Sequence, residues 1–175
     1  MNHLKNTNAA TSQKRRFLNA AKIVCILAAL FLLLNILWFT WRSRKYGAFT
    51  EGMTETEFSS FWVPRYVDSY DGYNYSVKYP NYLSLTGNLA LSMPSDENAM
   101  YTDALIIWPN ANGSYEYGVL LYDENEWNIY VDEYGQALDS QYDEVVENHQ
   151  ENISLLFAKA NERWGLTKQM GTQFL

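Results

Sequence analysis

The chain has almost no cysteine or histidine, and each of its two long regions is poor in charge of one sign. One cysteine and two histidines occur in 175 residues, and only one of them, His149, follows residue 45. The larger region therefore cannot build a cysteine-based or multi-histidine zinc site. Residues 1–45 contain eight lysines or arginines and no carboxylate, whereas residues 46–175 contain all twenty carboxylates and five basic residues. The two regions therefore carry formal charges of +8 and −15. Such an acidic larger region excludes a lysine-rich or arginine-rich nucleic-acid-binding protein.

Charged residues are also missing from Ile23 to Trp41, a run of nineteen residues with the sequence IVCILAALFLLLNILWFTW. A helix rises about 1.5 Å per residue, so this run matches the hydrocarbon thickness of a bilayer. It ends in aromatic residues such as Trp38 and is followed closely by basic residues, the order typical of a membrane interface. A cleaved signal peptide has a shorter apolar region and a small-x-small cleavage site. The sequence thus predicts a basic tail over residues 1–22 and a retained transmembrane helix over residues 23–41.

Basic residues lie on both sides of this run, five before it and three closely after it. The end of a span that carries more positive charge tends to stay in the cytoplasm. The excess before the run therefore predicts a cytoplasmic N-terminus and an extracytoplasmic C-terminal domain at the cell membrane. The outer region contains no cysteine, which suits an exported bacterial domain better than a eukaryotic secretory route. Asn35 can hydrogen-bond across paired helices, which leaves a weak homodimer through this segment open.

From residue 71 onward, apolar residues alternate with polar ones, which is the pattern of half-buried β-strands. Proline, glycine or acidic turns separate these segments from one another. Five strands are predicted: Tyr73 to Tyr79, Leu83 to Met93 with a bend or bulge at Gly87, Ala104 to Trp108, Tyr115 to Tyr122, and Trp127 to Val131. The short connections between them predict antiparallel neighbours in a meander.

Nearer the C-terminus the period changes, because apolar residues recur every three or four positions from Tyr142 to Trp164. This spacing predicts one amphipathic helix. Ser140 and Asp143 resemble a capping box at its start, and Gly165 is a C-cap signal at its end.

These elements together predict an α+β fold with a single N-terminal transmembrane helix. An antiparallel β-meander of about five strands would pack on a C-terminal amphipathic helix, in an extracytoplasmic domain covering residues 71–175. Residues 42–70 are expected to be a juxtamembrane tether or a short helix, for which Thr54 and Glu57 could provide the cap.

Residue types that serve catalysis or metal binding are scarce in the outer region. His149 is its one histidine and falls on the apolar side of the predicted helix, where a partly buried, hydrogen-bonded histidine is favoured over a catalytic one. The acidic turn that starts at Asp123 lacks the glycine and glutamate that an EF-hand loop requires. Carboxylate pairs suited to a glycosidase cannot be selected by spacing alone. We expect no enzyme activity, no cofactor and no metal site.

Tyrosine is abundant, and all fourteen tyrosines follow the apolar run, many of them beside acidic residues. A single helix can cover only one face of the sheet, so the other face needs a different covering. Any one tyrosine could be core filler, but as a set their rigid rings and polar hydroxyls suit a protein interface. The acidic charge would attract a basic protein partner. The residues of this predicted binding surface are Tyr73, Tyr75, Tyr115, Glu116, Tyr117, Tyr130, Asp132, Glu133 and Tyr134.

Four stretches give the chain a resemblance to a known family: NYLSLTGNLAL (Asn81 to Leu91), ALIIWP (Ala104 to Pro109), YEYGVLLYDE (Tyr115 to Glu124) and ANERWG (Ala160 to Gly165). With the order of anchor, tyrosine-rich meander and terminal helix, they resemble the TipC-type immunity proteins of Gram-positive bacteria. The resemblance implies a membrane-tethered protein that binds and neutralises an LXG toxin exported by type VII secretion. The toxins of that family act on cell-wall precursor at the outer membrane surface, and the resemblance implies no catalytic residues.

Two other functions stay open at the level of sequence. Asn35 and the basic cytoplasmic tail suit an accessory or sensory module of an envelope or secretion complex. Aromatic rings that can stack on sugars suit a cell-wall glycan-binding or hydrolytic domain. An inhibitor is favoured over both, because the expected sheet is acidic, aromatic and outward-facing and lacks a catalytic set.

Overall fold

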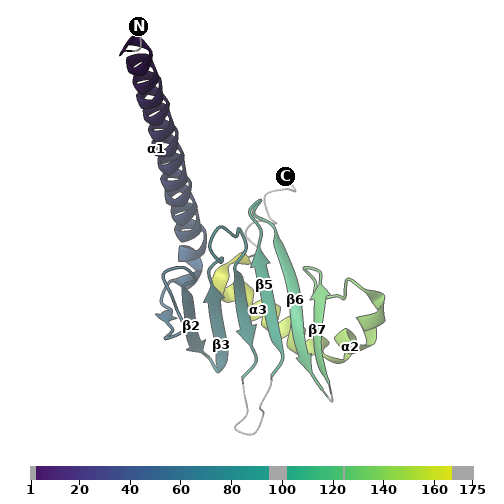
Figure 1. Ribbon diagram of the computed structural model, residues 1–175. Coiled ribbons are helices and arrows are strands. Elements are labelled where there is room, and N and C mark those ends of the chain that lie inside the picture. The colour runs from purple at the N-terminus through teal and green to yellow at the C-terminus, as the bar shows by residue number, and fades with distance from the viewer. Residues whose placement is uncertain (1–2, 95–101, 124, 167–175) are drawn as a thin grey trace, which may run out of the picture. The chain divides into compact units, whose positions relative to one another are not determined.

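The computed structural model describes residues 3–94, 102–123 and 125–166 and divides the chain into two compact units (Figure 1). The first unit covers residues 1–43 and the second covers residues 44–175. The first is formed by helix α1 (His3–Gly47), whose last turn belongs to the second unit together with all of the strands and the remaining helices.

Helix α1 contains the apolar run that the sequence predicts as a membrane anchor. The segment Leu18–Thr50 is long and apolar enough to cross a membrane, by length and composition. From Leu18 to Leu37 the large apolar side chains around the helix are at least half exposed, with Ile23 at 57% and Leu34 at 60%. A helix that is apolar all round is stable in lipid or in a protein core, and the exposure of these side chains favours lipid.

Two polar side chains of α1 contact residues of the same helix. The Arg42 guanidinium lies 4.8 Å from the ring centroid of Trp38 and 4.7 Å from that of Phe39, a cation–aromatic cluster that suits the membrane interface. The Asn35 side-chain amide donates to the Phe31 carbonyl at 2.8 Å. This amide hydrogen is therefore bonded within the helix, and pairing of two helices through Asn35 stays a prediction.

The second unit contains a sheet of seven strands joined in chain order, each antiparallel to its neighbours. The strands are β1 (Thr54–Glu55), β2 (Arg65–Tyr70), β3 (Tyr73–Lys78), β4 (Asn88–Ser92), β5 (Ala104–Pro109), β6 (Tyr115–Tyr122) and β7 (Glu126–Val131). The predicted α+β class and the antiparallel meander are confirmed. The strand number is seven rather than about five.

The two additional strands come from residues 42–70, for which the sequence predicts a tether or a short helix. In the structure this stretch ends α1, forms the short helix η1 (Ala48–Thr50) and then adds β1 and β2 to the sheet. Thr54, expected as a helix cap, lies in β1. No residue of β2 is buried, so its sequence has no apolar stripe by which a strand is recognised. The sheet thus begins before residue 71.

The strand predicted over residues 83–93 is wrong in its first half, which forms a loop before β4. Leu83 has a positive φ of 59° there, which no strand accommodates. Gly87 is not a bulge but a point of close approach. A Cβ on it would lie 2.3 Å from the Lys78 carbonyl oxygen and 2.9 Å from the Tyr46 ring. Its N–H donates to the Tyr46 hydroxyl at 2.7 Å, so only glycine fits.

The single helix predicted over residues 142–164 is broken in two. The elements are η2 (Ser140–Tyr142), α2 (Asp143–Asn148) and α3 (Gln150–Trp164). The break falls at His149, whose backbone has φ −104° and ψ 9°. Periodicity alone cannot show such a break, because one non-helical residue barely shifts the apolar stripe.

The cap at the start of this helical region differs from the predicted one, whereas the cap at its end agrees with the prediction. Asp139 rather than Ser140 provides the N-cap, and its carboxylate accepts the Gln141 N–H at 3.1 Å. Gly165 ends α3 in the left-handed conformation with φ 63°. The predicted glycine C-cap is thus confirmed.

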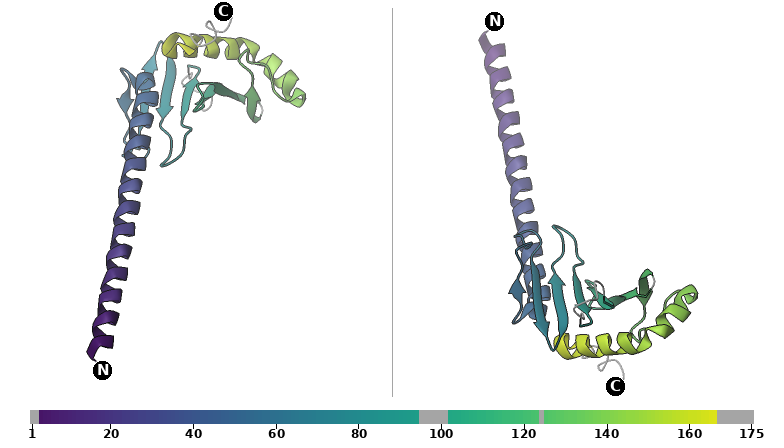
Figure 2. Two further views of the ribbon diagram at one scale, coloured as in Figure 1. Left: turned by 90° about the horizontal axis from the view of Figure 1, so that it is seen from above. Right: turned by 90° about the horizontal axis from the view of Figure 1, so that it is seen from below.

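Helix α3 lies along one face of the sheet (Figure 2). Three of its side chains, Ile153, Leu156 and Ala160, are fully buried. Along each strand, every second side chain points toward this helix. We call the face of the sheet formed by these side chains the covered face. One register row of this face is Tyr75, Leu91, Leu105, Val119 and Ile129. Every member of that row is at most 2% exposed, so this layer forms the core of the domain.

Candidate functional site

The other parity of the strands forms a second surface, which we call the open face. One register row across it is Ser76, Ala90, Ile106, Gly118 and Tyr130. Tyr130 is 59% exposed, and the row is otherwise made of small or half-buried residues. An accessible sheet face of this kind is where a partner can dock on the domain.

The parity of the covered face includes four of the nine residues predicted as a partner surface: Tyr73, Tyr75, Tyr115 and Tyr117. Tyr73, Tyr75 and Tyr117 are at most 9% exposed. The Tyr75 ring packs edge-on against Trp164 at a centroid distance of 5.7 Å, and the Tyr117 ring lies 5.2 Å from Phe157. Both ring partners belong to α3. This part of the prediction is wrong, because strand alternation places these tyrosines under the helix.

Burial also determines the protonation of the inward tyrosines. Burial, with smaller contributions from Tyr115 and Glu133, raises the pKa of the Tyr117 hydroxyl to about 12. Burial likewise raises the pKa of Tyr75 and of Tyr115. Tyr115 is half-buried, and its ring centroid lies 6.3 Å from that of Tyr117. These hydroxyls stay neutral at physiological pH and add no charge to the surface.

The open face carries an aromatic ridge made of Trp108 and Tyr130. Their ring centroids are 5.6 Å apart at an interplanar angle of 37°, within the range of favourable aromatic pairs. Gly118 makes room for the pair, since a Cβ there would lie 2.9 Å from two atoms of the Trp108 ring. The sequence pattern did not assign Trp108 to the surface. A glycine inside a strand was the available signal, because it often marks close approach of another group.

Glu116, one of the residues predicted for the partner surface, lies next to the ridge. It is the register partner of Trp108 on β6 and is exposed. Its carboxylate accepts a hydrogen bond from the Asn110 side-chain amide at 2.9 Å. The ridge therefore has an oriented carboxylate at its border, which a cationic side chain of a partner can approach.

The remaining predicted residues, Asp132, Glu133 and Tyr134, form a turn that follows β7. The Asp132 carboxylate accepts the N–H groups of Tyr134 and Gln136, both at 2.9 Å, so its first role is to shape the turn. Glu133 is exposed, and Tyr134 is 72% exposed. Glu133 and Tyr134 are therefore available at the surface, whereas Asp132 is partly engaged within the chain.

After this turn the chain pairs with the edge of β7. Val131 and Ala137 form an antiparallel bridge, and the Leu138 N–H donates to the Tyr130 carbonyl at 3.0 Å. Leu138 lies opposite Tyr130 and is 67% exposed. An exposed leucine thus extends the apolar border of the aromatic ridge.

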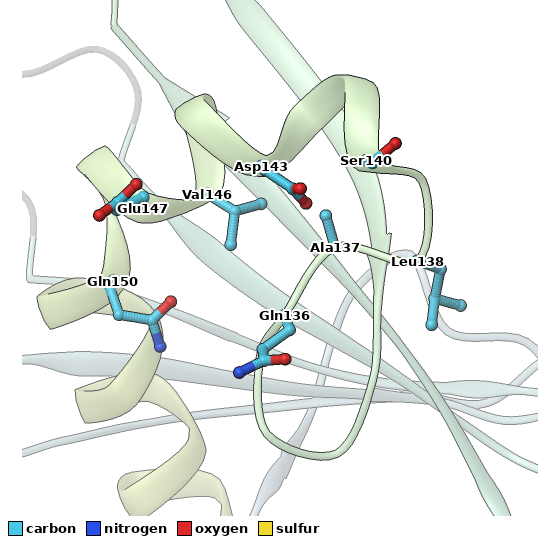
Figure 3. A pocket seen from close by; sticks show the side chains of 8 residues that line it. All are labelled: Gln136, Ala137, Leu138, Ser140, Asp143, Val146, Glu147 and Gln150. Carbon is cyan, nitrogen blue, oxygen red and sulfur yellow. The ribbon is translucent and has the colours of Figure 1, made fainter.

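A hollow of about 730 Å³ lies between this edge segment and the helices (Figure 3). Figure 3 shows loop side chains on one side and helix side chains on the other. Its lining residues are Gln136, Ala137, Leu138, Ser140, Asp143, Val146, Glu147 and Gln150. Two carboxylates and two amides in a lining with apolar walls suit a basic, hydrogen-bonding side chain.

A second hollow, of about 430 Å³, lies over the open face of β2 to β5. Small residues such as Ser76, Ala90 and Ala104 form its floor. The register row places it beside Ile106, on the β4 side of the aromatic ridge. The open face therefore has the aromatic ridge beside a hollow, and a partner of complementary shape can pack against both.

The most buried carboxylate of the described residues lies elsewhere, at the break between α2 and α3. Asp103 is 6% exposed and its carboxylate accepts the Tyr122 N–H at 2.9 Å and the Asn152 amide at 2.8 Å. It also lies 2.7 Å from Nδ1 of His149. His149 is thus held by a hydrogen bond, as the sequence favours, although at a helix break rather than on a continuous stripe. This cluster joins β6 to the helices.

Within residues 3–94, 102–123 and 125–166, no group of three or more histidine, cysteine, aspartate or glutamate side chains could hold a metal ion. Comparisons of the chain with known protein families, curated proteins and solved structures found no match. Its function is therefore inferred from the surfaces of the domain.

Proposed function

We propose that this chain is a membrane-tethered immunity protein. Helix α1 would span the cell membrane with the N-terminus in the cytoplasm, and the acidic domain would bind and neutralise a secreted antibacterial toxin outside the cell. The aromatic ridge of Trp108 and Tyr130 on the open face is the observation that carries the proposal. Tryptophan and tyrosine dominate the energetic centres of protein interfaces, because they bury a large rigid area at little entropic cost.

Charge favours a basic partner over an acidic one. Glu116 borders the ridge, Glu133 lies in the turn after β7, and Asp143 and Glu147 line the neighbouring hollow. Attraction between this acidic side of the domain and a basic toxin surface would speed encounter and make it sensitive to salt. The resemblance to TipC-type immunity proteins favours an LXG toxin of type VII secretion as that partner.

Rescue of poisoned cells tests the proposal. Cells exposed from outside to a candidate LXG toxin should survive when they express the chain. Glu116→Lys combined with Glu133→Lys should abolish survival, because both changes place positive charge toward a basic partner. Glu151→Lys is the matched control, since Glu151 is exposed on α3 and α3 lies over the covered face. Equal survival with the double variant and with the control would contradict an interface on the open face.

Glycan binding is a second candidate function, because the Trp108 and Tyr130 rings also offer aromatic faces on which a sugar ring can stack. Binding of the chain in detergent micelles to purified peptidoglycan, lost in Trp108→Ala, would favour it. An accessory or sensory role predicts instead that deletion of residues 1–15 abolishes function. A toxin inhibitor should tolerate that deletion, since its binding surface lies in the other unit.

A further inference from the structure

Two loops of the second unit expose apolar and aromatic side chains at the same end of the sheet. One connects β1 to β2 and the other connects β3 to β4. Trp62 of the first loop packs on Tyr82 of the second, with ring centroids 5.1 Å apart. We call them the interface loops. Their exposed apolar residues are Phe58 (75%), Phe61 (69%), Trp62 (52%), Tyr82 (37%), Leu83 (55%) and Leu85 (52%).

The chain itself brings these loops close to the predicted membrane surface. Tyr46 is fully buried in the second unit, where its hydroxyl accepts the Gly87 N–H at 2.7 Å and its ring lies 5.4 Å from that of Tyr79. Tyr46 follows Trp41, the last residue of the apolar run, by five positions. Five residues span at most about 18 Å in any conformation. The loop that holds Gly87 therefore starts within reach of the lipid headgroups.

Positive charge gathers at the same end of the sheet. Arg65 and Lys78 are direct register partners on β2 and β3, an arrangement of like charges that costs stability without a counter-charge. No ion pair joins either of them to a carboxylate in the described part of the chain, whereas Lys159 and Arg163 both have such partners. Lys45 also lies here, because its ammonium group donates to the Asn110 carbonyl in the turn between β5 and β6.

Carboxylates also occur at this end of the sheet, both on the β1 side of the loops and farther away, at Glu116 of β6 and in the turn that follows β7. Glu55 accepts a hydrogen bond from Ser59 within the first loop, and Glu57 precedes Phe58. The cations lie on the β2–β3 side, next to the loop that carries Leu83 and Leu85. An anionic bilayer would repel a domain that is so acidic overall, except at an end that combines cations with aromatic side chains.

We propose that the interface loops insert their apolar side chains into the headgroup region of the bilayer that α1 spans, with Arg65 and Lys78 binding anionic lipid headgroups. Tryptophan, tyrosine and basic residues prefer this depth of the membrane. The contact would fix which side of the domain faces the lipid and leave the open face directed along the membrane or away from it. The inference requires α1 to be a membrane anchor and does not require a toxin partner.

A lipid-quenching experiment on the full chain tests this contact. A Cys25→Ser background with Leu85→Cys, labelled with an environment-sensitive fluorophore, is placed in nanodiscs of phosphatidylglycerol and phosphatidylcholine that hold one chain each. Tyr70→Cys is the matched control, because Tyr70 is 62% exposed at the opposite end of β2. The probe at Leu85 should shift its emission to the blue and lose intensity with brominated lipids, and the probe at Tyr70 should do neither.

Two double variants test whether the apolar side chains and the cations both contribute to lipid binding. Phe61→Ala with Trp62→Ala, and Arg65→Gln with Lys78→Gln, should each reduce quenching of the Leu85 probe while the melting of the domain is unchanged. Equal behaviour of the Leu85 and Tyr70 probes would overturn the proposal. Quenching that needs a second chain in the nanodisc would overturn it in favour of a protein–protein contact. Failure of the chain to enter nanodiscs would overturn the anchor as well, whereas loss of toxin rescue would leave this result unaffected.

Discussion

Tyr75 and Tyr130 lie on opposite faces of the same sheet and differ in nearly every property except residue type. Tyr75 is 2% exposed and packs on Trp164 of α3, whereas Tyr130 is 59% exposed and packs on Trp108 beside a glycine. The covered face is a closely packed layer of rings and aliphatic side chains, and the open face has a ridge and a hollow. One face therefore stabilises the domain, and the other is the surface that we propose binds a partner.

Truncation of one leucine on each face should give the largest contrast. Leu105→Ala should lower the free energy of unfolding by about 2–5 kcal/mol, since Leu105 is fully buried on the covered face. Leu138→Ala should change it by no more than about 0.5 kcal/mol, because Leu138 is 67% exposed. Urea unfolding of the full chain in detergent micelles, followed by near-ultraviolet circular dichroism, measures both. Similar losses would mean that the two faces do not differ as described.

Gly118→Ala tests whether the Trp108 ring packs closely over Gly118 on the open face. The added Cβ would meet the Trp108 ring at 2.9 Å, and such overpacking costs about 1–3 kcal/mol. Gly47→Ala is the control, because nothing lies within 4 Å of a Cβ there. The cost should largely disappear when Gly118→Ala is combined with Trp108→Ala, in a double-mutant cycle of unfolding free energies. Additive losses would show that the ring does not lie over Gly118.

A smaller effect is expected on the pH dependence of the unfolding free energy, through Tyr117 on the covered face. The pKa of Tyr117 is raised from 10.0 to about 12 by burial, so the unfolded chain releases this proton before the folded one does. Its contribution to stability is therefore complete below pH 10 and is lost as the pH rises from 10 to about 12. Tyr117→Phe should flatten the fall in unfolding free energy over this range. An unchanged pH profile would indicate that the ring is accessible to water.

Much of the sheet could be predicted from the sequence, because strands with one buried parity carry a visible alternation. β3, β5, β6 and β7 follow that rule. β2 does not, since it lies near the sheet edge and buries none of its residues. The break at His149 also escaped prediction, because the contact with Asp103 that accompanies it joins residues 46 positions apart. Pairings over such distances leave no local pattern.

The candidate site was predictable in kind but not in detail. Alternation shows that tyrosines of one parity share a face, but it does not say which face the helix covers. Tyr73, Tyr75 and Tyr117 were therefore assigned to the surface although they lie in the core. Glu116 and Tyr130 were assigned correctly to an exposed position. Trp108 was missed because its exposure depends on a glycine of the neighbouring strand.

The affinity of the full chain for the toxin proposed as its partner tests most directly whether the open face is the binding surface. Measured by calorimetry in nanodiscs, Trp108→Ala should weaken binding about 30-fold or more, because truncation of a central interface residue costs roughly 2 kcal/mol or more. Leu155→Ala should leave the dissociation constant unchanged, since Leu155 is 42% exposed on α3 and lies off the open face. Weaker binding by Leu155→Ala with full affinity in Trp108→Ala would contradict the account.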